Sequence, residues 1–161
     1  MKVCFVCLGN ICRSPMAEFI LKDMANKSDI KFKIDSDSKA TSYEEEGKDI
    51  YYLAKDKLNE KNIPFEKRKV SVLRKEDYDK YDYIIGMDDN NIMDIKRIIG
   101  SDPKNKVYKL LDFCDTFKEI EDPWYTRDFE KAYQDIHQGC NSFLNYLKYN
   151  YESTRGDFND N

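Results

Sequence analysis

The residues of this sequence best suited to chemistry lie in one short segment near its start, between Cys7 and Ser14. Five residues separate Cys7 from Arg13, and a short apolar run precedes the segment. A loop that runs into a helix points several backbone N–H groups at one spot, and the helix dipole adds positive potential there. Arg13 can bind two oxygens of an anion with its planar guanidinium. The segment therefore predicts a site for an oxygen-bearing anion.

Cys7 would lie at the end of a strand, beneath that anion. The loop amides and Arg13 would favour the thiolate form of Cys7 at neutral pH, and Ser14 could donate a hydrogen bond to the sulfur. Gly9 permits a close backbone approach, and Asn10 tolerates a left-handed conformation. A cysteine and an arginine also occur at this spacing by chance, but the strand–loop–helix context favours a functional site. A Walker loop is excluded because the Gly-Lys-Ser/Thr ending is absent.

The composition limits what else the chain could be. Its 161 residues suit one domain, and a net charge of −4 disfavours nucleic-acid binding. Five cysteines cannot form a complete set of internal disulfides, and a single histidine excludes a His-rich metal site. One histidine also leaves little room for a Cys–His catalytic pair, so another group must activate a working cysteine. We therefore expect neither a metal nor another cofactor.

The sequence shows no targeting or membrane segment. The first apolar stretch, residues 3–8, has six residues, whereas a signal-peptide core needs about 7–15 and a membrane span about 20. We expect a cytoplasmic monomer with reduced thiols and no membrane contact. Residues 1–150 are expected to form the domain, and residues 151–161 a polar, flexible tail.

The apolar pattern predicts strands that alternate with helices. Strand candidates are residues 3–7, 32–35, 82–87 and 107–111, with a weaker one at 70–73. Helices are expected from Pro15, with Ser14 as the cap, after Gly47, and over 91–99 and 129–149. This alternation predicts an α/β fold: a single-domain, three-layer sandwich with a twisted parallel sheet of four or five strands and helices on both faces, flavodoxin-like or Rossmann-like. Such sheets bind ligands at the carboxyl ends of their strands, where the Cys7 segment falls.

Three segments carry a resemblance to a known family. Residues 6–18, VCLGNICRSPMAE, resemble the signature of the low-molecular-weight protein tyrosine phosphatases, and residues 122–125, Asp-Pro-Trp-Tyr, resemble that family's second signature. Met87 and Asp88, with Asn91, add to a similarity that covers roughly residues 2–148. The two signatures lie over a hundred residues apart and in the expected order, so together they are highly specific.

The resemblance implies hydrolysis of phosphotyrosine in proteins through a cysteinyl-phosphate. Cys7 would attack phosphorus, and the Arg13 side chain and the loop amides would stabilise the charge of the transition state. Asp122 would protonate the leaving phenolate and then activate water. The Asp122-Pro123 pair on its own is also an ordinary turn signal. The implied phosphate-binding positions are Leu8, Gly9, Asn10, Ile11, Cys12 and Arg13.

The resemblance also implies supporting roles around this loop. Ser38 would hydrogen-bond to Asn10, and Ser14 is the second supporting residue. Many family members carry a histidine that orders the cysteine loop, and the nearest residue here is Arg68. Cys12 would either form a reversible disulfide that shields the nucleophile or pack as a small core residue.

Aromatic and acidic residues are candidates for the substrate pocket. Tyr43, Trp124 and Tyr125 could form the walls of a slot for a phenyl ring, with core packing as the alternative. Ile11 is similar to the tyrosine-specific members, since arginine phosphatases of the same fold carry threonine there. Residues 44–46 are three glutamates, which would either suit substrates with basic flanking residues or form a solvated loop.

Three other functions remain open: a protein arginine phosphatase of the same fold, a thiol-dependent arsenate reductase, and a non-catalytic phosphate-binding module. An arsenate reductase places glutamine after the Arg-Ser pair and needs two further redox cysteines. Here Pro15 follows Ser14, and Cys114 and Cys140 lack a suitable spacing. A pure binder would need neither a nucleophile nor an acid. The expected partner is a phosphotyrosine-containing protein, with phosphate and vanadate as inhibitory anions.

Overall fold

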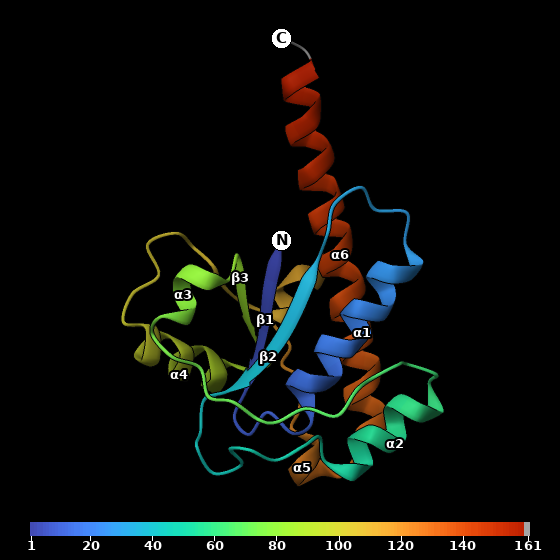
Figure 1. Ribbon diagram of the computed structural model, residues 1–161, viewed down its shortest axis with the longest axis vertical. Helices are drawn as coiled ribbons and strands as arrows, with labels where there is room; N and C mark the ends of the chain where they lie inside the picture. The colour runs from blue at the N-terminus through green and yellow to red at the C-terminus, as the bar shows by residue number, and fades with distance from the viewer. Residues whose placement is uncertain (160–161) are drawn as a thin grey trace.

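The computed structural model describes residues 1–159, with side chains to residue 151, and has a four-stranded parallel sheet at its centre (Figure 1). The strands are β1 (Lys2–Cys7), β2 (Asp35–Ala40), β3 (Tyr83–Gly86) and β4 (Val107–Lys109), in the order β2-β1-β3-β4. Val3 pairs with Ser36 on one side and with Tyr83 on the other, so β1 is a central strand. The predicted α/β class with a four-stranded parallel sheet is therefore confirmed.

Helices cover both faces of the sheet and complete the predicted three layers (Figure 1). One face is covered by α1 (Arg13–Lys27) and α6 (Phe129–Asn159), with α2 (Tyr52–Glu60) beside them. The other face is covered by α3 (Asp77–Lys80) and α4 (Asp89–Ile99). Two short elements, the 3-10 helix η1 (Leu110–Cys114) and α5 (Pro123–Thr126), lie between β4 and α6. Within residues 1–159, no helix is both long and apolar enough to cross a membrane.

Both faces of β1 are buried, which explains the continuous apolar run at residues 3–7. Val3 and Phe5 pack into the core cluster that includes α1 and α6. Cys4 and Val6 point the other way and pack with Ile95 of α4. The strand is thereby fixed between two layers, and its carboxyl end is held in a constant position.

The end of β1 is also the place where the strand order switches direction. From β1 the chain passes through α1 to β2 on one side, and later enters β3 on the other side. In Figure 1 the loop after β1, the segment before α2 and the short α5 all gather at this end of the sheet. A crevice at such a switch point is the usual ligand site of an open parallel sheet, and Cys7 lies beside it.

The second strand does not lie where the apolar pattern placed it. It runs over Asp35–Ala40 and not over 32–35. The apolar pattern missed it because β2 is an edge strand with mostly polar residues. Phe32 and Ile34, which suggested a strand, instead pack against the core from the preceding loop. The weaker candidate at 70–73 is not a fifth strand: in the described part of the chain it contributes one bridge, between Ala40 and Val72.

Two helix ends also differ from the sequence prediction. α1 begins at Arg13 with Cys12 at the capping position, so Ser14 lies inside the first turn and is not the cap. α6 continues to Asn159 and not to 149, so the backbone of most of the expected tail is helical. Residues 160–161 of that tail lie outside the described residues. The division into a domain and a flexible tail stays a prediction.

We predict that Gly139→Ala destabilises the protein, although alanine favours a helix over glycine by about 0.5–1 kcal/mol. A Cβ at Gly139 would lie 2.6 Å from Cγ of Leu110, which is fully buried. Overpacking of this kind costs about 1–3 kcal/mol, so the net free energy of unfolding should fall. Urea unfolding measures it. In a Leu110→Ala background, Gly139→Ala should become neutral or stabilising. If Gly139→Ala alone stabilised the protein, this account of the contact between α6 and η1 would be contradicted.

Candidate active site

The loop after β1 curls around the sulfur of Cys7. Asn10 is buried and adopts the left-handed conformation, with φ of 57°, which asparagine tolerates better than most residues. This turn brings the Asn10 backbone N–H to 3.2 Å from Cys7 Sγ, to which it donates. The predicted conformation of Asn10 is thus confirmed, and its purpose is to aim an amide at the sulfur.

A chain of hydrogen bonds sets the orientation of the Ser14 hydroxyl. Asn10 Nδ2 donates to Ser14 Oγ at 2.7 Å, and Ser14 Oγ lies 3.0 Å from Cys7 Sγ. Since the oxygen already accepts from the amide of Asn10, its own proton is free to point at the sulfur. This arrangement places a donor hydroxyl at the sulfur of Cys7. It also explains why Ser14 does not cap α1: its hydroxyl serves the sulfur.

Arg68 holds the loop from outside. Its Nη2 donates to the carbonyl oxygen of Asn10, and its Nη1 donates to the carbonyl oxygen of Lys48 at 3.3 Å. Asp49 accepts a further bond from the Arg68 backbone N–H at 3.2 Å. Burial lowers the pKa of Arg68 somewhat, yet an arginine stays charged. Arg68 therefore orders the cysteine loop, as the sequence suggested.

Arg13 is buried beneath the loop and is paired on several sides. Its Nη1 donates to Asp88 Oδ2 and to the carbonyl oxygen of Ile120, both at 2.7 Å, and its Nη2 lies 3.5 Å from Asp122 Oδ2. Burial alone would lower the pKa of Arg13, but the negative charge of Cys7 and of two carboxylates outweighs it and raises that pKa. The guanidinium is consequently a fixed cation, held in one orientation at the end of β1.

Asp122 joins the site from the far end of the chain. Its Oδ1 accepts a hydrogen bond from the Trp124 backbone N–H at 3.0 Å and so caps α5, while its Oδ2 faces Arg13. The carboxylate is 25% exposed, so it can reach a bound group. The Asp-Pro pair does form a turn, and that turn directs the Asp122 carboxylate toward Arg13, while the acid role stays a prediction.

A small cavity of about 70 Å³ lies over the loop. Its lining contains Cys7, all of the predicted phosphate-binding positions, Asp122, Trp124 and Tyr125. Trp124 and Tyr125 are 43% and 75% exposed, so their rings are available to a ligand. The predicted site residues that come together here are Cys7, Leu8, Gly9, Asn10, Ile11, Cys12, Arg13, Asp122, Trp124 and Tyr125.

Two predicted residues are placed elsewhere. Tyr43 is 69% exposed and does not line this cavity, because the turn that follows it directs Glu44 and Glu45 inward instead. Ser38 donates to Glu18 Oε1 at 2.7 Å and not to Asn10, whose side chain is engaged with Ser14. Its supporting role on the loop is therefore wrong.

None of the five cysteines forms a disulfide. Burial, with a smaller effect from neighbouring Cys7, raises the pKa of Cys12 well above its usual value. Cys12 therefore stays protonated next to the nucleophile, and the implied disulfide between them stays a prediction. Cys114 and Cys140 do not line the cavity, which removes the relay that an arsenate reductase would need.

Some functional neighbours were not identified as site residues from the sequence. Asp88, which pairs with Arg13, also caps α4 and exchanges hydrogen bonds with Asn91. The signal was its position after β3, since neighbouring parallel strands end at the same edge. Glu44 and Glu45, by contrast, belong to the three glutamates that were expected either to suit basic flanking residues or to form a solvated loop, and both line the cavity.

The geometry agrees with the comparisons to known proteins. A profile of the "Low molecular weight phosphotyrosine protein phosphatase" family matches residues 2–153. The chain belongs to this family. Its members include YfkJ of Bacillus subtilis, a low molecular weight protein-tyrosine-phosphatase that is 36% identical over 146 residues, which are 89% of this chain and 94% of YfkJ. PtpA of Staphylococcus saprophyticus, also a low molecular weight protein-tyrosine-phosphatase, is 39% identical over 149 residues, which are 90% of this chain and 92% of PtpA.

Solved structures of family members share the fold. The crystal structure of Bacillus subtilis YfkJ superposes with a TM-score of 0.88 at 35% identity, covering 93% of this chain and 96% of YfkJ. A Drosophila arginine phosphatase superposes with a TM-score of 0.84 at 28% identity, covering 92% of this chain and 98% of that protein. The family fold therefore includes relatives named for two different phosphorylated side chains.

Proposed function

We propose that this protein hydrolyses phosphotyrosine in proteins through a cysteinyl-phosphate formed on Cys7. The observation that carries the proposal is the meeting of a buried thiol, a fixed guanidinium and a carboxylate in one small cavity. Cys7 and Arg13 share one loop, whereas Asp122 lies more than a hundred residues later in the sequence. A module that only binds phosphate would need neither the thiol nor the carboxylate.

In the first step the Cys7 thiolate attacks phosphorus, and the bond from phosphorus to the phenolic oxygen breaks. Asp122, in its protonated form, gives its proton to that oxygen, so tyrosine leaves neutral. Loop amides and Arg13 stabilise the charge that spreads over the remaining phosphoryl oxygens. The Arg13 guanidinium is already oriented by Asp88, which lowers the reorganisation that the step requires.

In the second step water replaces Cys7 on phosphorus. The Asp122 carboxylate takes a proton from the attacking water, and the sulfur–phosphorus bond breaks to regenerate the thiolate and release inorganic phosphate. The hydroxyl of Ser14 and the N–H of Asn10 stabilise the departing sulfur, to which both lie within hydrogen-bonding distance. Phosphate and vanadate should inhibit by occupying the same cradle. We further infer a cytoplasmic location, since thiols stay reduced in that compartment. We also infer that the protein is a monomer.

The cavity suits an aromatic substrate because apolar and aromatic side chains form part of its lining. Trp124 and Tyr125 present rings, and Ile11 packs against two core clusters while lining the cavity. The second candidate is phosphoarginine, and one observation favours it: Glu44 and Glu45 line the same cavity and could pair with a guanidinium. The relatives named protein-tyrosine-phosphatases, at 36% and 39% identity, support the first candidate.

We predict that substitutions of Cys7 and Asp122 both lower the turnover of 4-nitrophenyl phosphate but differ in their other effects. Cys7→Ser should lower turnover at least about 10³-fold and abolish the burst of nitrophenol, because no covalent intermediate forms. Asp122→Asn should lower turnover about 10²–10⁴-fold while phosphate still binds, because the amide cannot shuttle a proton. Stopped-flow absorbance and calorimetry with phosphate measure both. Full activity of Cys7→Ser would exclude the covalent route, and weakened binding with normal turnover would exclude Asp122 as the acid.

We predict that a phosphotyrosine peptide is hydrolysed faster than a phosphoarginine peptide of otherwise identical sequence. Ile11 offers an apolar surface to a phenyl ring and no polar group to a guanidinium. The Ile11→Thr variant should therefore lower the ratio of kcat/KM for the phosphotyrosine peptide to kcat/KM for the phosphoarginine peptide. Phosphate release from both peptides by both variants is the measurement. A wild-type preference for phosphoarginine would assign the protein to the second candidate.

We predict that basic residues beside the phosphotyrosine improve kcat/KM, because Glu44 and Glu45 line the cavity that the substrate enters. Changing either glutamate to glutamine should reduce the advantage of a lysine-flanked over a glutamate-flanked peptide about two- to fivefold, the usual scale for exposed ion pairs. Glu46→Gln is the matched control, since Glu46 does not line the cavity. Equal effects of all three variants would show that only net charge matters.

A further inference from the structure

Arg127 has a backbone conformation that is unusual for its residue type. It ends α5 in the left-handed region with φ of 60°, and its N–H donates to the carbonyl oxygen of Pro123 at 2.9 Å. A residue with a Cβ adopts this conformation at a cost, and glycine would adopt it freely. The catalytic steps above make no use of Arg127. The contacts of its side chain offset this cost.

The guanidinium of Arg127 lies against three aromatic rings. Its central carbon is 5.5 Å from the ring centre of Tyr51 and 5.8 Å from those of Trp124 and Phe129. Nη2 donates to the Tyr51 hydroxyl at 2.8 Å, and Nη1 donates to the carbonyl oxygen of Trp124 at 3.3 Å. The side chain thus ties α5 to the segment before α2, a contact that the fork of an arginine suits well.

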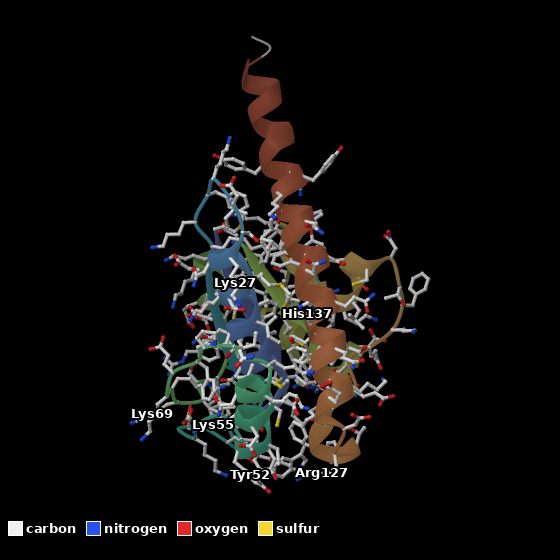
Figure 2. All side chains as sticks on the ribbon, turned by 90° about the vertical axis from the view of Figure 1, so that its right-hand side faces the viewer. Lys27, Tyr52, Lys55, Lys69, Arg127 and His137 are labelled. Carbon is white, nitrogen blue, oxygen red and sulfur yellow. The ribbon has the colours of Figure 1, made fainter. Side chains whose placement is uncertain are left out.

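Tyr51 in turn is attached to the loop that carries the nucleophile. Its backbone N–H donates to the carbonyl oxygen of Ile11 at 2.9 Å. Its ring meets that of Trp124 edge to face, with centres 4.9 Å apart. Arg127 and the cysteine loop are therefore connected through a single residue that both contact. Figure 2 shows Arg127 at the foot of α6, at the same end of the molecule as Tyr52, the neighbour of Tyr51.

The acid belongs to the turn that Arg127 holds. The Asp122 carbonyl oxygen accepts from the N–H groups of Tyr125 and Thr126, both at 3.1 Å, and its carboxylate caps the same turn at Trp124. α5 has only four residues, so it cannot hold its position by its own hydrogen bonds. A shift of α5 would move the Asp122 carboxylate relative to the sulfur of Cys7.

We propose that Arg127 is a positioning residue that holds the acid-bearing turn at a fixed distance from the cysteine loop, through Tyr51. The inference rests on the proposed function, because it concerns the proton that Asp122 delivers. Its consequence is specific: loss of the clamp impairs proton delivery to the leaving group and leaves the attack of sulfur on phosphorus intact. Correct placement of a reacting group is sensitive to shifts of about 1 Å.

The test compares leaving groups in the Arg127→Gly variant, since glycine keeps the backbone conformation and removes the clamp. kcat/KM reports the first step. For phenyl phosphate, whose leaving group needs the proton, it should fall about tenfold, a part of the total that general acid catalysis supplies. For 2,4-dinitrophenyl phosphate, whose leaving group departs without a proton, it should change less than about twofold. Equal losses for the two esters, or no loss for either, would overturn the proposal.

Two further variants and a stability measurement separate the clamp from charge and from stability. Arg127→Lys keeps the charge but not the fork, and should behave like Arg127→Gly; full activity would show that charge alone matters. Tyr51→Phe removes the accepting hydroxyl and should cause a smaller loss in the same direction, non-additive with Arg127→Gly. In urea the Arg127→Gly variant should be as stable as the parent or more so, because the left-handed strain is relieved. A destabilised variant that loses activity evenly on both esters would indicate a merely structural role.

Asp122→Asn shows whether a failure concerns Arg127 or the acid itself. It should give the steepest dependence on the leaving group. If Asp122→Asn gives no such dependence, the acid assignment in the proposed function fails. If Asp122→Asn gives it and Arg127→Gly does not, the proposed function stands and the positioning role of Arg127 is wrong.

Discussion

The structure of the site depends on the burial of one charge, the guanidinium of Arg13. A buried cation without partners is strongly destabilising, so the chain must bring it acceptors. Asp88 from the end of β3, the carbonyl oxygen of Ile120 and, at longer range, Asp122 supply them. These groups come from two segments that are distant in the sequence from Arg13. Pairing Arg13 therefore also assembles the edge of the sheet, and it places the acid near the nucleophile as part of the same arrangement.

The cysteine loop brings hydrogen-bond donors to the sulfur of Cys7, beside which no imidazole lies. The left-handed turn at Asn10 aims a backbone N–H at the sulfur, and the side chain of the same residue orients Ser14 toward it. Arg68 fixes the turn through the Asn10 carbonyl oxygen. One asparagine thus contributes its backbone conformation, its donor and its acceptor, which is why no other residue type would serve equally well at this position.

The sequence predicted most where local patterns decide the structure. β1, the anion loop and the Asp-Pro turn each carry their signal within a few residues. For Ser14 the predicted contact with the Cys7 sulfur is present, whereas the predicted helix cap was wrong because α1 begins at Arg13, one residue before Ser14. Prediction was also wrong at the polar edge strand β2 and at Tyr43, where tertiary packing decides the outcome. The link from Arg127 through Tyr51 to Ile11 has no sequence signature, because three distant segments form it.

The scarcity of histidine follows from this design. The single histidine, His137, lies on the exposed surface of the first third of α6, beside Tyr133 and away from the cavity (Figure 2). Three arginines carry the positive charge that histidine supplies in many other active sites. They are Arg13 in the cysteine loop, Arg68 on the outside of that loop and Arg127 on the turn that bears Asp122. Arginine stays protonated throughout the physiological range. The framework around the reacting atoms therefore keeps a constant charge and geometry, and proton transfer is confined to the groups that exchange protons with substrate and water.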